Sequence, residues 1–492
     1  MAKPHHLPPS AASLTASLRD LGYSLETAVA DLIDNSISAD ATDIQIFCDL
    51  SRMSPVLVIL DNGHGMSEAE TIAAMRHGVT APRKPRGPKD LGRFGLGLKT
   101  ASFSQCKRLT VVSAKSGVRA GAEWNLKKVE DDDDWFIDVL DLDEIDAQPF
   151  IETLGPTGTL VTWRELDRLF EEEIGQKRDE IVHEKLAVVE RHLSLVFHRF
   201  LAGEIKGRKK LTIRINGHPI TPFDPFCRKN AATQMLPEET VWVDDIAVSM
   251  QPYILPHHSR LSALEYDYYQ DRSDFISNQG AYVYRNGRLM AWGDWFRLVP
   301  KGEATKLARI QIDFSNSLDE AWTIDIKKSR ARPPHAVRER LRQIIAKITS
   351  RSVTVHRGRG QRLFHESEAP LWERYADRSG IRFAINTHHP LIASLSSCVS
   401  SEEAASLQVV LDAIAASLPI EMIYSDYSTS PREVSQISAG ESPTLDRLRS
   451  LKQALYGNGP GDPKTFLQIV RSTHLFEGQI DVAEKYIRET FA

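Results

Sequence analysis

Residues 25–36 read LETAVADLIDNS, and their apolar members recur at intervals of three and four residues. This spacing predicts a helix with one buried stripe, made of Leu25, Ala28, Val29, Leu32 and Ile33. Asp31 and Asn35 stand one helical turn apart on another face, so a carboxylate and a carboxamide oxygen can converge on one point. A Mg²⁺-bound phosphate and its attacking water require such a pair. Solvated or capping side chains would produce the same pattern.

The motif DNGHGM, residues 61–66, follows the continuous apolar run Val56–Leu60, which we interpret as a buried strand. Asp61 would stand at the end of that strand, where its carboxylate can accept a hydrogen bond from an exocyclic amine such as that of adenine. Gly63 and Gly65 would let the backbone before Met66 approach a ligand closely. An ordinary Asp-Asn-Gly turn is the alternative interpretation.

A third motif, GRFGLGLK at residues 92–99, opens a predicted helix. Free backbone N–H groups and the positive end of the helix dipole can hold phosphates there. Its candidate residues are Gly92, Gly95, Leu96, Gly97, Leu98 and Lys99. Because Leu98 separates the last glycine from the lysine, the motif is not a P-loop.

The remainder of the N-terminal part is predicted to be a layer of helices on a sheet. Ser67 and Glu70 form a capping box that begins a helix, and the Pro-, Arg- and Lys-rich segment His77–Leu91 is expected to be a mobile loop. Further strands are predicted at Asp43–Leu50, Arg108–Ala114, Ala122–Leu126, Trp135–Leu140 and Gly158–Trp163. Thr159, at the start of the last strand, could supply a hydroxyl to the same pocket.

Taken together and in this order, the four motifs resemble the GHKL superfamily. That superfamily includes DNA gyrase B subunits, ninety-kilodalton heat-shock chaperones, MutL proteins and sensor histidine kinases, and this sequence resembles MORC-type ATPases in particular. The resemblance implies an α+β fold, the GHKL (Bergerat) ATP-binding sandwich, with ATP and Mg²⁺ as cofactors.

The resemblance also implies a role for each motif. Asn35 matches the Asn that holds Mg²⁺ in the family, and Asp61 matches the Asp that contacts adenine. The segment Gly92–Lys99 matches the family's phosphate loop, His77–Leu91 matches its lid, and Thr159 matches its Thr. Asp31 stands where the family usually has a Glu as general base. Because Asp is one methylene shorter, its carboxylate falls ~1 Å short of the Glu position. We therefore expect hydrolysis that is slow or depends on dimerisation, and a nucleotide-binding adaptor with little hydrolysis is an alternative.

A second domain is predicted after a long amphipathic helix, Asp179–Leu201. Its predicted strands are Leu211–Asn216, Tyr282–Met290 with a hairpin turn at Asn286-Gly287, Ala308–Phe314 and Trp322–Lys327, and a helix over Ala336–Ile348 follows. The region resembles the transducer-type β-α domain of MutL and MORC proteins, which sends a lysine to the γ-phosphate. Lys328 is the best match and Lys327 the alternative. A solvated lysine pair at a strand end is the competing interpretation.

We thus expect an ATP-binding domain at residues 1–175, a transducer-like domain at 176–350 and a mainly helical domain at 351–492. Helices in the last domain are predicted at 403–417, 444–456, 464–472 and 480–490. Basic clusters at Lys206–Lys210, Lys327–Arg342 and Arg351–Arg362 could follow a phosphate backbone, although solvated helix faces produce the same pattern.

The resemblance implies an ATP-dependent conformational switch. ATP would order the lid and an N-terminal strap, two subunits would close into a homodimer, and Lys328 would couple the γ-phosphate to the second domain. DNA is the implied partner, in a setting of prokaryotic restriction or phage defence, with other defence or repair proteins as further partners. A protein-remodelling chaperone is the alternative function.

The composition describes a globular protein without naming a partner. The 492 residues are 41% hydrophobic and 26% charged, with a formal net charge of −5. The four cysteines, at 48, 106, 227 and 398, lack paired spacing, so neither a disulfide framework nor a thiolate zinc site is expected. Neither a signal peptide nor a membrane-crossing run is recognisable. We therefore expect a cytoplasmic location and no membrane association.

Overall fold

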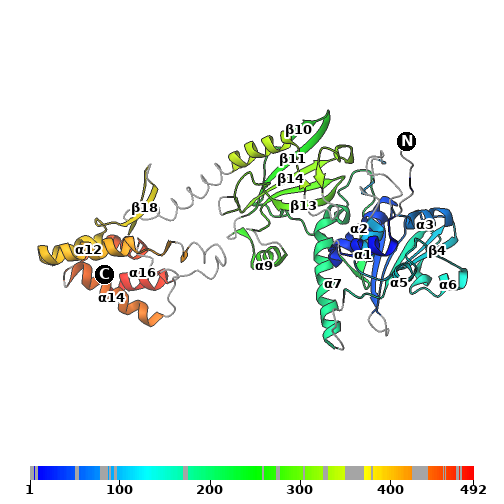
Figure 1. Ribbon diagram of the computed structural model, residues 1–492. Helices are drawn as coiled ribbons and strands as arrows, with labels where there is room; N and C mark the ends of the chain where they lie inside the picture. Colours follow the sequence, from blue (N-terminus) through cyan, green and yellow to red (C-terminus); the bar gives the residue numbers. More distant parts are fainter. Residues whose placement is uncertain are drawn as a thin grey trace. The chain divides into compact units, whose positions relative to one another are not determined.

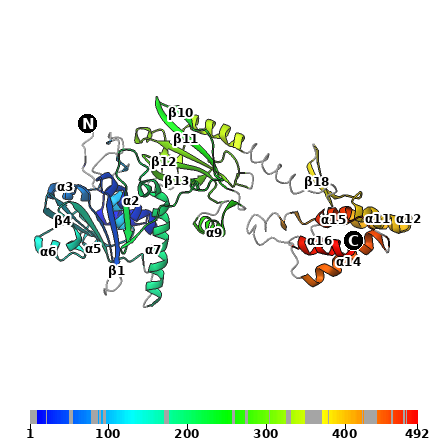
Figure 2. The ribbon, with the colours of Figure 1, turned by 180° about the vertical axis from the view of Figure 1, so that it is seen from behind.

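The computed structural model divides the chain into two compact units, residues 1–348 and 349–492 (Figure 1, Figure 2). It describes residues 5, 9–20, 22–49, 55–77, 87, 90–92, 97–169, 176–256, 260–272, 277–302, 305–324, 331–348, 371–377, 380–420, 422–423, 441–457, 459, 461–472, 476 and 479–491. Within these ranges, none of the helices has both the length and the apolar character that crossing a bilayer requires.

The first unit contains an eight-stranded sheet with the strand order β5-β4-β3-β6-β2-β1-β7-β8. Its strands are β1 (Asp43–Asp49), β2 (Val56–Asp61), β3 (Arg108–Lys115), β4 (Val118–Asn125), β5 (Asp138–Leu140), β6 (Gly158–Arg164), β7 (Thr212–Ile215) and β8 (His218–Pro219). Neighbouring strands are antiparallel except β1 and β7, which are parallel. The strands predicted in the N-terminal part are present with two main differences in extent. Strand β4 begins earlier than expected, at Val118, and β5 covers only Asp138–Leu140 of the predicted Trp135–Leu140.

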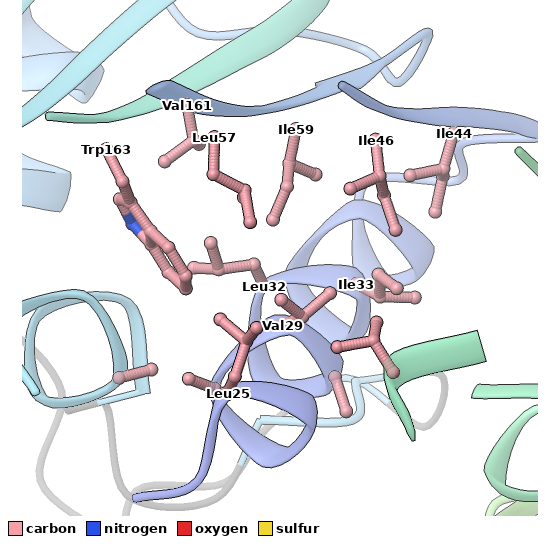
Figure 3. Close-up of a cluster of buried hydrophobic side chains, with 14 of the residues drawn as sticks. Leu25, Val29, Leu32, Ile33, Ile44, Ile46, Leu57, Ile59, Val161 and Trp163 are labelled. Atoms are coloured by element: carbon pink, nitrogen blue, oxygen red, sulfur yellow. The ribbon is translucent and has the colours of Figure 1, made fainter. Parts of the chain in front are cut away.

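One face of this sheet packs against helices. They are α1 (Ala11–Arg19), α2 (Leu25–Ser38), α3 (Glu68–Met75), α4 (Gly97–Phe103), α5 (Leu126–Asp132) and α7 (Gln176–Val196). Among them, α2 carries Asp31 and Asn35, and α4 begins within the glycine motif. The buried stripe predicted for α2 is confirmed. Figure 3 shows its side chains pointing at the sheet residues Ile44, Ile46, Leu57, Ile59, Val161 and Trp163. The capping box of Ser67 and Glu70 at the start of α3 is also confirmed.

The opposite face of the sheet is also covered, by α6 (Leu142–Asp146) and the 3₁₀ helix η1 (Ile151–Thr153). Val56, Val58 and Leu60 pack on this side, while Leu57 and Ile59 pack against the helices. Strand β2 is therefore buried on both faces, which explains its continuous apolar run.

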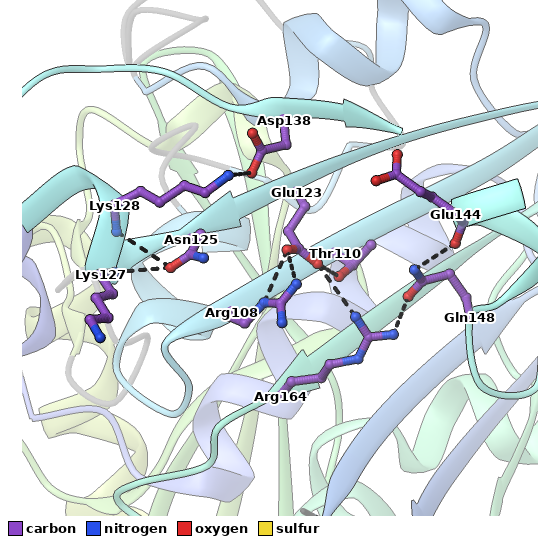
Figure 4. A network of polar contacts seen from close by, with 10 residues as sticks. All are labelled: Arg108, Thr110, Glu123, Asn125, Lys127, Lys128, Asp138, Glu144, Gln148 and Arg164. Carbon is purple, nitrogen blue, oxygen red and sulfur yellow. Dashed lines mark hydrogen bonds and ion pairs between the residues drawn. The ribbon is translucent and has the colours of Figure 1, made fainter. Parts of the chain in front are cut away.

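A buried carboxylate joins three adjacent strands of the sheet (Figure 4). Glu123 on β4 is 4% exposed and accepts hydrogen bonds from Arg108 Nε at 3.0 Å and from Thr110 Oγ1 at 2.6 Å. Arg164 on β6 donates to Glu123 at 3.4 Å and to Gln148 at 2.7 Å. Because two guanidinium groups compensate its charge, Glu123 is a structural element of the sheet.

The long helix predicted at 179–201 is interrupted. Helix α7 ends at Val196, and a short helix α8 (His198–Ala202) follows Phe197, which is fully buried with φ −106° and ψ 14°. Strand β7 then pairs in parallel with β1. The segment predicted as the first strand of a second domain therefore belongs to the N-terminal sheet.

The first unit also contains a six-stranded sheet with the order β10-β11-β14-β12-β13, in which β9 pairs with β11. Its strands are β9 (Gln234–Met235), β10 (Glu239–Val243), β11 (Ile246–Ile254), β12 (Gly280–Arg285), β13 (Arg288–Asp294) and β14 (Ala308–Phe314). The hairpin turn at Asn286-Gly287 is confirmed, with φ values of 50° and 83°. Also present are α9 (Ala263–Arg272), the pair β15 (Thr323–Ile324) and β16 (Ala331–Arg332), and the predicted helix, over residues 335–348.

The second unit is mainly helical, as predicted. Its helices α12 (Ser401–Ala416), α14 (Glu441–Tyr456), α15 (Pro463–Ser472) and α16 (Ile480–Thr490) match the predicted positions. The core is built from α14, α15 and α16 around Leu448, Phe466 and Ala483. A hairpin of β17 (Trp372–Asp377) and β18 (Gly380–Ile385) and the helix α11 (Pro390–Cys398) were not predicted.

Candidate nucleotide-binding site

Helix α2 places a buried carboxylate one turn before an exposed carboxamide. Asp31 is 3% exposed, and its Oδ2 accepts a hydrogen bond from the Tyr23 hydroxyl at 3.2 Å. Asn35 lies on the exposed side of the helix. The two side chains therefore occupy different environments: Asp31 is held by a fixed partner, while Asn35 is open to a ligand.

The first and third motifs meet in the structure. A Cβ atom built on Gly97, the first residue of α4, would lie 3.7 Å from Oδ2 of Asp31. The carboxylate of Asp31 therefore stands directly beside the helix start that the sequence proposes for phosphates. An added Cβ would be at ordinary van der Waals distance from this carboxylate, so Gly97 and Asp31 are close neighbours.

Asp61 ends β2 in a cradle of hydrogen-bond donors. Its Oδ2 accepts from the Ser36 hydroxyl at 2.7 Å, and its Oδ1 accepts from the Gly63 amide at 2.9 Å. Burial raises the pKa of Asp61 above its ordinary value, while the bonds from Ser36, Gly63 and the Thr159 amide act in the opposite direction. These donors hold the carboxylate in one orientation at the strand end.

Two glycines of the DNGHGM motif allow close backbone contacts. Gly65 has φ +67°, and a Cβ atom there would lie 1.8 Å from the carbonyl oxygen of Ala114. A Cβ atom on Gly63 would lie 2.9 Å from Ala39 and 3.0 Å from Oδ1 of Asp61. Both positions therefore exclude any larger residue.

Thr159 and Met66 are joined through Ser113 of β3. The Ser113 hydroxyl lies 2.9 Å from Oγ1 of Thr159, and it accepts a hydrogen bond from the Met66 amide at 2.9 Å. Thr159 also pairs with Asp61 across the β2–β6 ladder. The structure thus brings together Asp61, Met66 and Thr159, which the sequence places in separate motifs.

The third motif is described only at its ends. The Gly92 amide donates to Asp90 Oδ1 at 2.7 Å, and Leu98 packs at the edge of the main core. Lys99 is 4% exposed and donates from Nζ to the Ala74 carbonyl of α3 at 2.9 Å. Burial lowers the pKa of Lys99 to about 8. In this structure its ammonium is therefore directed to α3.

Several predicted site residues lie outside the described residues. They are Gly95 and Leu96 of the third motif, Lys327 and Lys328, and most of the predicted lid at 77–91, of which His77, Gly87, Asp90 and Leu91 are described. Their roles stay predictions.

Sequence reasoning missed the residues that orient the site. Tyr23, Ser36 and Ser113 carry hydroxyls that bond to Asp31, Asp61 and Thr159. Ser36 could have been noticed, since it follows Asn35 directly on α2. The contacts of Tyr23 and Ser113 depend on tertiary packing, which no local pattern encodes.

Comparisons with known proteins agree with this geometry. Residues 23–156 match the family described as histidine kinase-, DNA gyrase B-, and HSP90-like ATPase. The chain is 33% identical to ATPase morc-1 of Caenorhabditis elegans over 93 residues, which are 19% of this chain and 10% of that protein. It is 34% identical to the DNA mismatch repair protein MutL of Colwellia psychrerythraea over 125 residues, 23% of this chain and 19% of that protein.

A third relative is the chaperone protein HtpG of Nocardia farcinica, which is 25% identical over 103 residues, 18% of this chain and 16% of that protein. The chain thus matches no more than about a fifth of the length of these relatives, in each case within a limited region. Asp31, Asn35 and Asp61 and the described ends of the glycine motif all lie inside the matched family region. Residues 23–156 thus match the histidine kinase-, DNA gyrase B- and HSP90-like ATPase family, and the N-terminal region is similar to parts of MORC ATPases, MutL and HtpG.

Proposed function

We propose that the protein is an ATP-dependent conformational switch that hydrolyses ATP slowly and acts on DNA as a homodimer. The observation that carries this proposal is the position of Asp31. Its buried carboxylate stands beside Gly97, where the glycine motif opens α4. A triphosphate held by that helix start would have its terminal phosphate next to a carboxylate that can accept a proton.

The remaining site residues would bind and orient the nucleotide. Asp61 would accept a hydrogen bond from the adenine amine, supported by Gly63, Gly65, Met66 and Thr159 around it. The glycine motif would hold the phosphates through its backbone N–H groups, which belong to Gly92, Gly95, Leu96, Gly97, Leu98 and Lys99. Lys99 would contribute its ammonium if it left the Ala74 carbonyl.

The residues present fit a nucleotide-bound Mg²⁺ ion. Among the described residues, no group of three or more His, Cys, Asp or Glu is placed to hold a metal ion by itself. Magnesium that keeps several waters and binds mainly to phosphates needs only one or two protein oxygens. The exposed carboxamide of Asn35 can supply one, and the ion would neutralise phosphate charge when bound.

Asp31 would act as the general base for the attacking water. The Tyr23 hydroxyl donates to its Oδ2 at 3.2 Å and so helps to orient the carboxylate. Because its side chain is shorter than that of Glu, the water would be held less favourably. We therefore propose slow turnover, accelerated when a second subunit closes the lid at residues 77–91 and Lys328 reaches the γ-phosphate.

Helix α1 is the element that such closure would rearrange as the N-terminal strap. In the single chain it packs on its own domain: the Ala12 amide donates to Asp133 at 2.9 Å, and Arg19 donates to Asp167 at 2.6 Å. The Arg19 contact is partly buried and the Ala12 contact is exposed, so the start of α1 is the end that can be released first.

The proposed DNA contact is the basic cluster Lys206–Lys210. Lys206, Lys209 and Lys210 are exposed. The cluster borders a hollow of about 370 Å³ whose lining includes Lys206, Arg208 and the acidic Glu204. The exposed lysines beside this hollow suit a phosphate backbone. MutL, a relative by sequence, is named as a DNA mismatch repair protein. Restriction or phage defence, with other defence or repair proteins as partners, is the setting we propose.

A protein-remodelling chaperone is the second candidate function. One relative, HtpG, is named a chaperone protein. Helix α12 also exposes Val409, Val410 and Ile414 at 68%, 53% and 48%, an apolar surface that could hold an unfolded polypeptide. A cytoplasmic location is proposed for either function, because Cys48, Cys106 and Cys227 are buried free thiols.

The test measures ATP turnover, oligomeric state and DNA retention with and without nucleotide. We expect ATP to promote dimers and to change DNA retention, with an affinity that falls as salt rises. Replacing Lys206, Lys209 and Lys210 by Gln should reduce the salt slope and leave ATP turnover in the absence of DNA unchanged. No DNA binding at low salt would overturn the DNA-acting switch, and ATP-dependent suppression of aggregation without DNA binding would support the chaperone.

A further inference from the structure

Arg285, the last residue of β12, is a buried arginine that contacts the backbone at the start of the glycine motif. Its side chain is 1% exposed, and its Nε and Nη2 atoms bond both oxygens of Asp319 at 2.6 Å. The same guanidinium donates to the carbonyl of Leu91 at 3.0 Å and to the carbonyl of Gly92 at 3.3 Å. Asp319 thus compensates the charge, and the remaining N–H groups bind backbone just where the glycine motif begins.

Neighbouring contacts hold the same short segment from two sides. Asn286 donates to the Asp90 carbonyl at 3.3 Å. On the other side, the Leu91 amide donates to the hydroxyl of Ser38, the last residue of α2, at 3.1 Å. Residues 90–92 are therefore fixed between the helix that carries Asp31 and the β12–β13 hairpin of the second sheet.

We propose that Arg285 is a positioning residue for the ATPase: it fixes the backbone at Gly92, so that recognition of the triphosphate depends on the second sheet. This inference rests on the proposed function. Arginine suits the task because its planar group can bind a carboxylate and successive carbonyl oxygens at once. A lysine keeps the charge but has neither the planar shape nor the reach to all of these acceptors.

The proposal separates phosphate recognition from adenine recognition. In the proposed site, Asp61 binds adenine from the end of β2. Ser36 and Gly63 donate hydrogen bonds to Asp61, and among the described residues neither is seen to contact Arg285. Loss of the Arg285 contacts should therefore weaken the preference for a γ-phosphate and leave the shared adenosine contacts intact. A merely structural role would weaken all nucleotides in the same proportion.

The experiment compares wild type, Arg285→Lys and the matched control Arg164→Lys, which alters the Glu123 network away from the site. Titration calorimetry measures the affinities for ADP and for a non-hydrolysable ATP analogue in Mg²⁺ buffer, and steady-state assays give kcat and KM. We expect Arg285→Lys to lose about tenfold or more of the preference for the analogue over ADP and about tenfold in kcat, with a smaller loss of affinity for ADP. Arg164→Lys should keep both the preference and kcat.

Two contrary results have different meanings. If wild type binds both nucleotides and Arg285→Lys keeps the wild-type preference and kcat, the role of Arg285 is overturned while the proposed function stands. If the wild type binds neither nucleotide, the proposed function itself is overturned, and the role of Arg285 with it. Thermal unfolding of Arg285→Lys and Arg164→Lys measures how far each substitution destabilises the fold. If the two variants are equally destabilised but differ in nucleotide preference, the result supports the positioning role.

Discussion

Arg288 on β13 and Asp34 on α2 form an ion pair in which both side chains are almost completely buried, at 3% and 1% exposure, with 3.2 Å between Nε and Oδ2. Asp34 directly precedes Asn35, the residue proposed to hold magnesium. The pair therefore attaches the helix of the nucleotide site to the second sheet. Together with the contacts of Arg285 and Asn286, it connects the β12–β13 hairpin to the domain that carries the candidate nucleotide site.

Breaking this pair should destabilise the protein strongly. Replacing Arg288 by Met leaves the Asp34 carboxylate buried without its cation, so we expect the free energy of unfolding to fall by about 3–5 kcal/mol. Urea denaturation measures the change. The control is Arg168→Met, which breaks an exposed pair with Asp20 and should cost less than about 1 kcal/mol. Equal effects of the two substitutions would contradict the burial argument.

The general base can be tested by an isosteric change. Asp31→Asn can still accept the hydrogen bond from Tyr23 but cannot take a proton from water. We expect turnover to fall by about 10²-fold or more, while the affinity for a non-hydrolysable ATP analogue stays within about threefold of wild type. A variant that retained full turnover would show that Asp31 is not the base.

The DNGHGM turn should not tolerate a side chain at Gly65. With φ +67° and the Ala114 carbonyl oxygen 1.8 Å from the added Cβ, Gly65→Ala must displace β3, and we expect a loss of about 3 kcal/mol or more. Gly117 is the matched control, since it has φ +82° and nothing within 4 Å of an added Cβ. Gly117→Ala should cost only the left-handed backbone strain of about 1–2 kcal/mol. Similar losses at both positions would refute the close contact.

Acid stability should depend on His77, the first residue of the predicted lid. Its ring lies among Phe103, Trp124 and Trp135, with centroid distances of 5.5, 5.6 and 5.0 Å. Burial is the main cause that lowers the pKa of His77 to about 4, and nearby Lys99 adds to it. The unfolded chain takes up this proton near pH 6.5 and the folded chain only near pH 4, so acidification through that window favours unfolding.

His77→Phe keeps an aromatic ring and removes the proton uptake. We expect the wild type to lose stability relative to the variant as the pH falls from 6.5 to 4, and the difference to be constant above pH 7. Denaturation curves at a series of pH values provide the comparison. Parallel acid profiles for the two proteins would show that folding does not lower the pKa of His77.

Local patterns predicted the elements that carry the site. The apolar spacing of α2, the capping box at Ser67 and the turn at Asn286-Gly287 each depend on neighbours in sequence, and each is confirmed. The break at Phe197 was missed because no glycine or proline marks it and the apolar period continues into α8. The strand β7 was predicted, but nothing in its sequence states that its partner is β1.

The site shows the same division. Residue types and spacing predicted Asp31, Asn35 and Asp61 as site residues, because carboxylates and amides near glycines are chemically specific. Their different burial, and the contacts of Tyr23, Ser36 and Arg285, arise from elements that lie far apart in sequence. Such contacts are products of tertiary packing, which one sequence does not display.

The most direct test of the account is calorimetric titration of the protein with a non-hydrolysable ATP analogue in Mg²⁺ buffer. We predict a saturable heat with one site per chain for wild type and Asp31→Asn, and no measurable heat for Asn35→Ala or Asp61→Asn. If wild-type protein gives no adenine-nucleotide heat, or if Asp61→Asn binds as well as wild type, then α2, the end of β2 and the glycine motif do not form a nucleotide pocket.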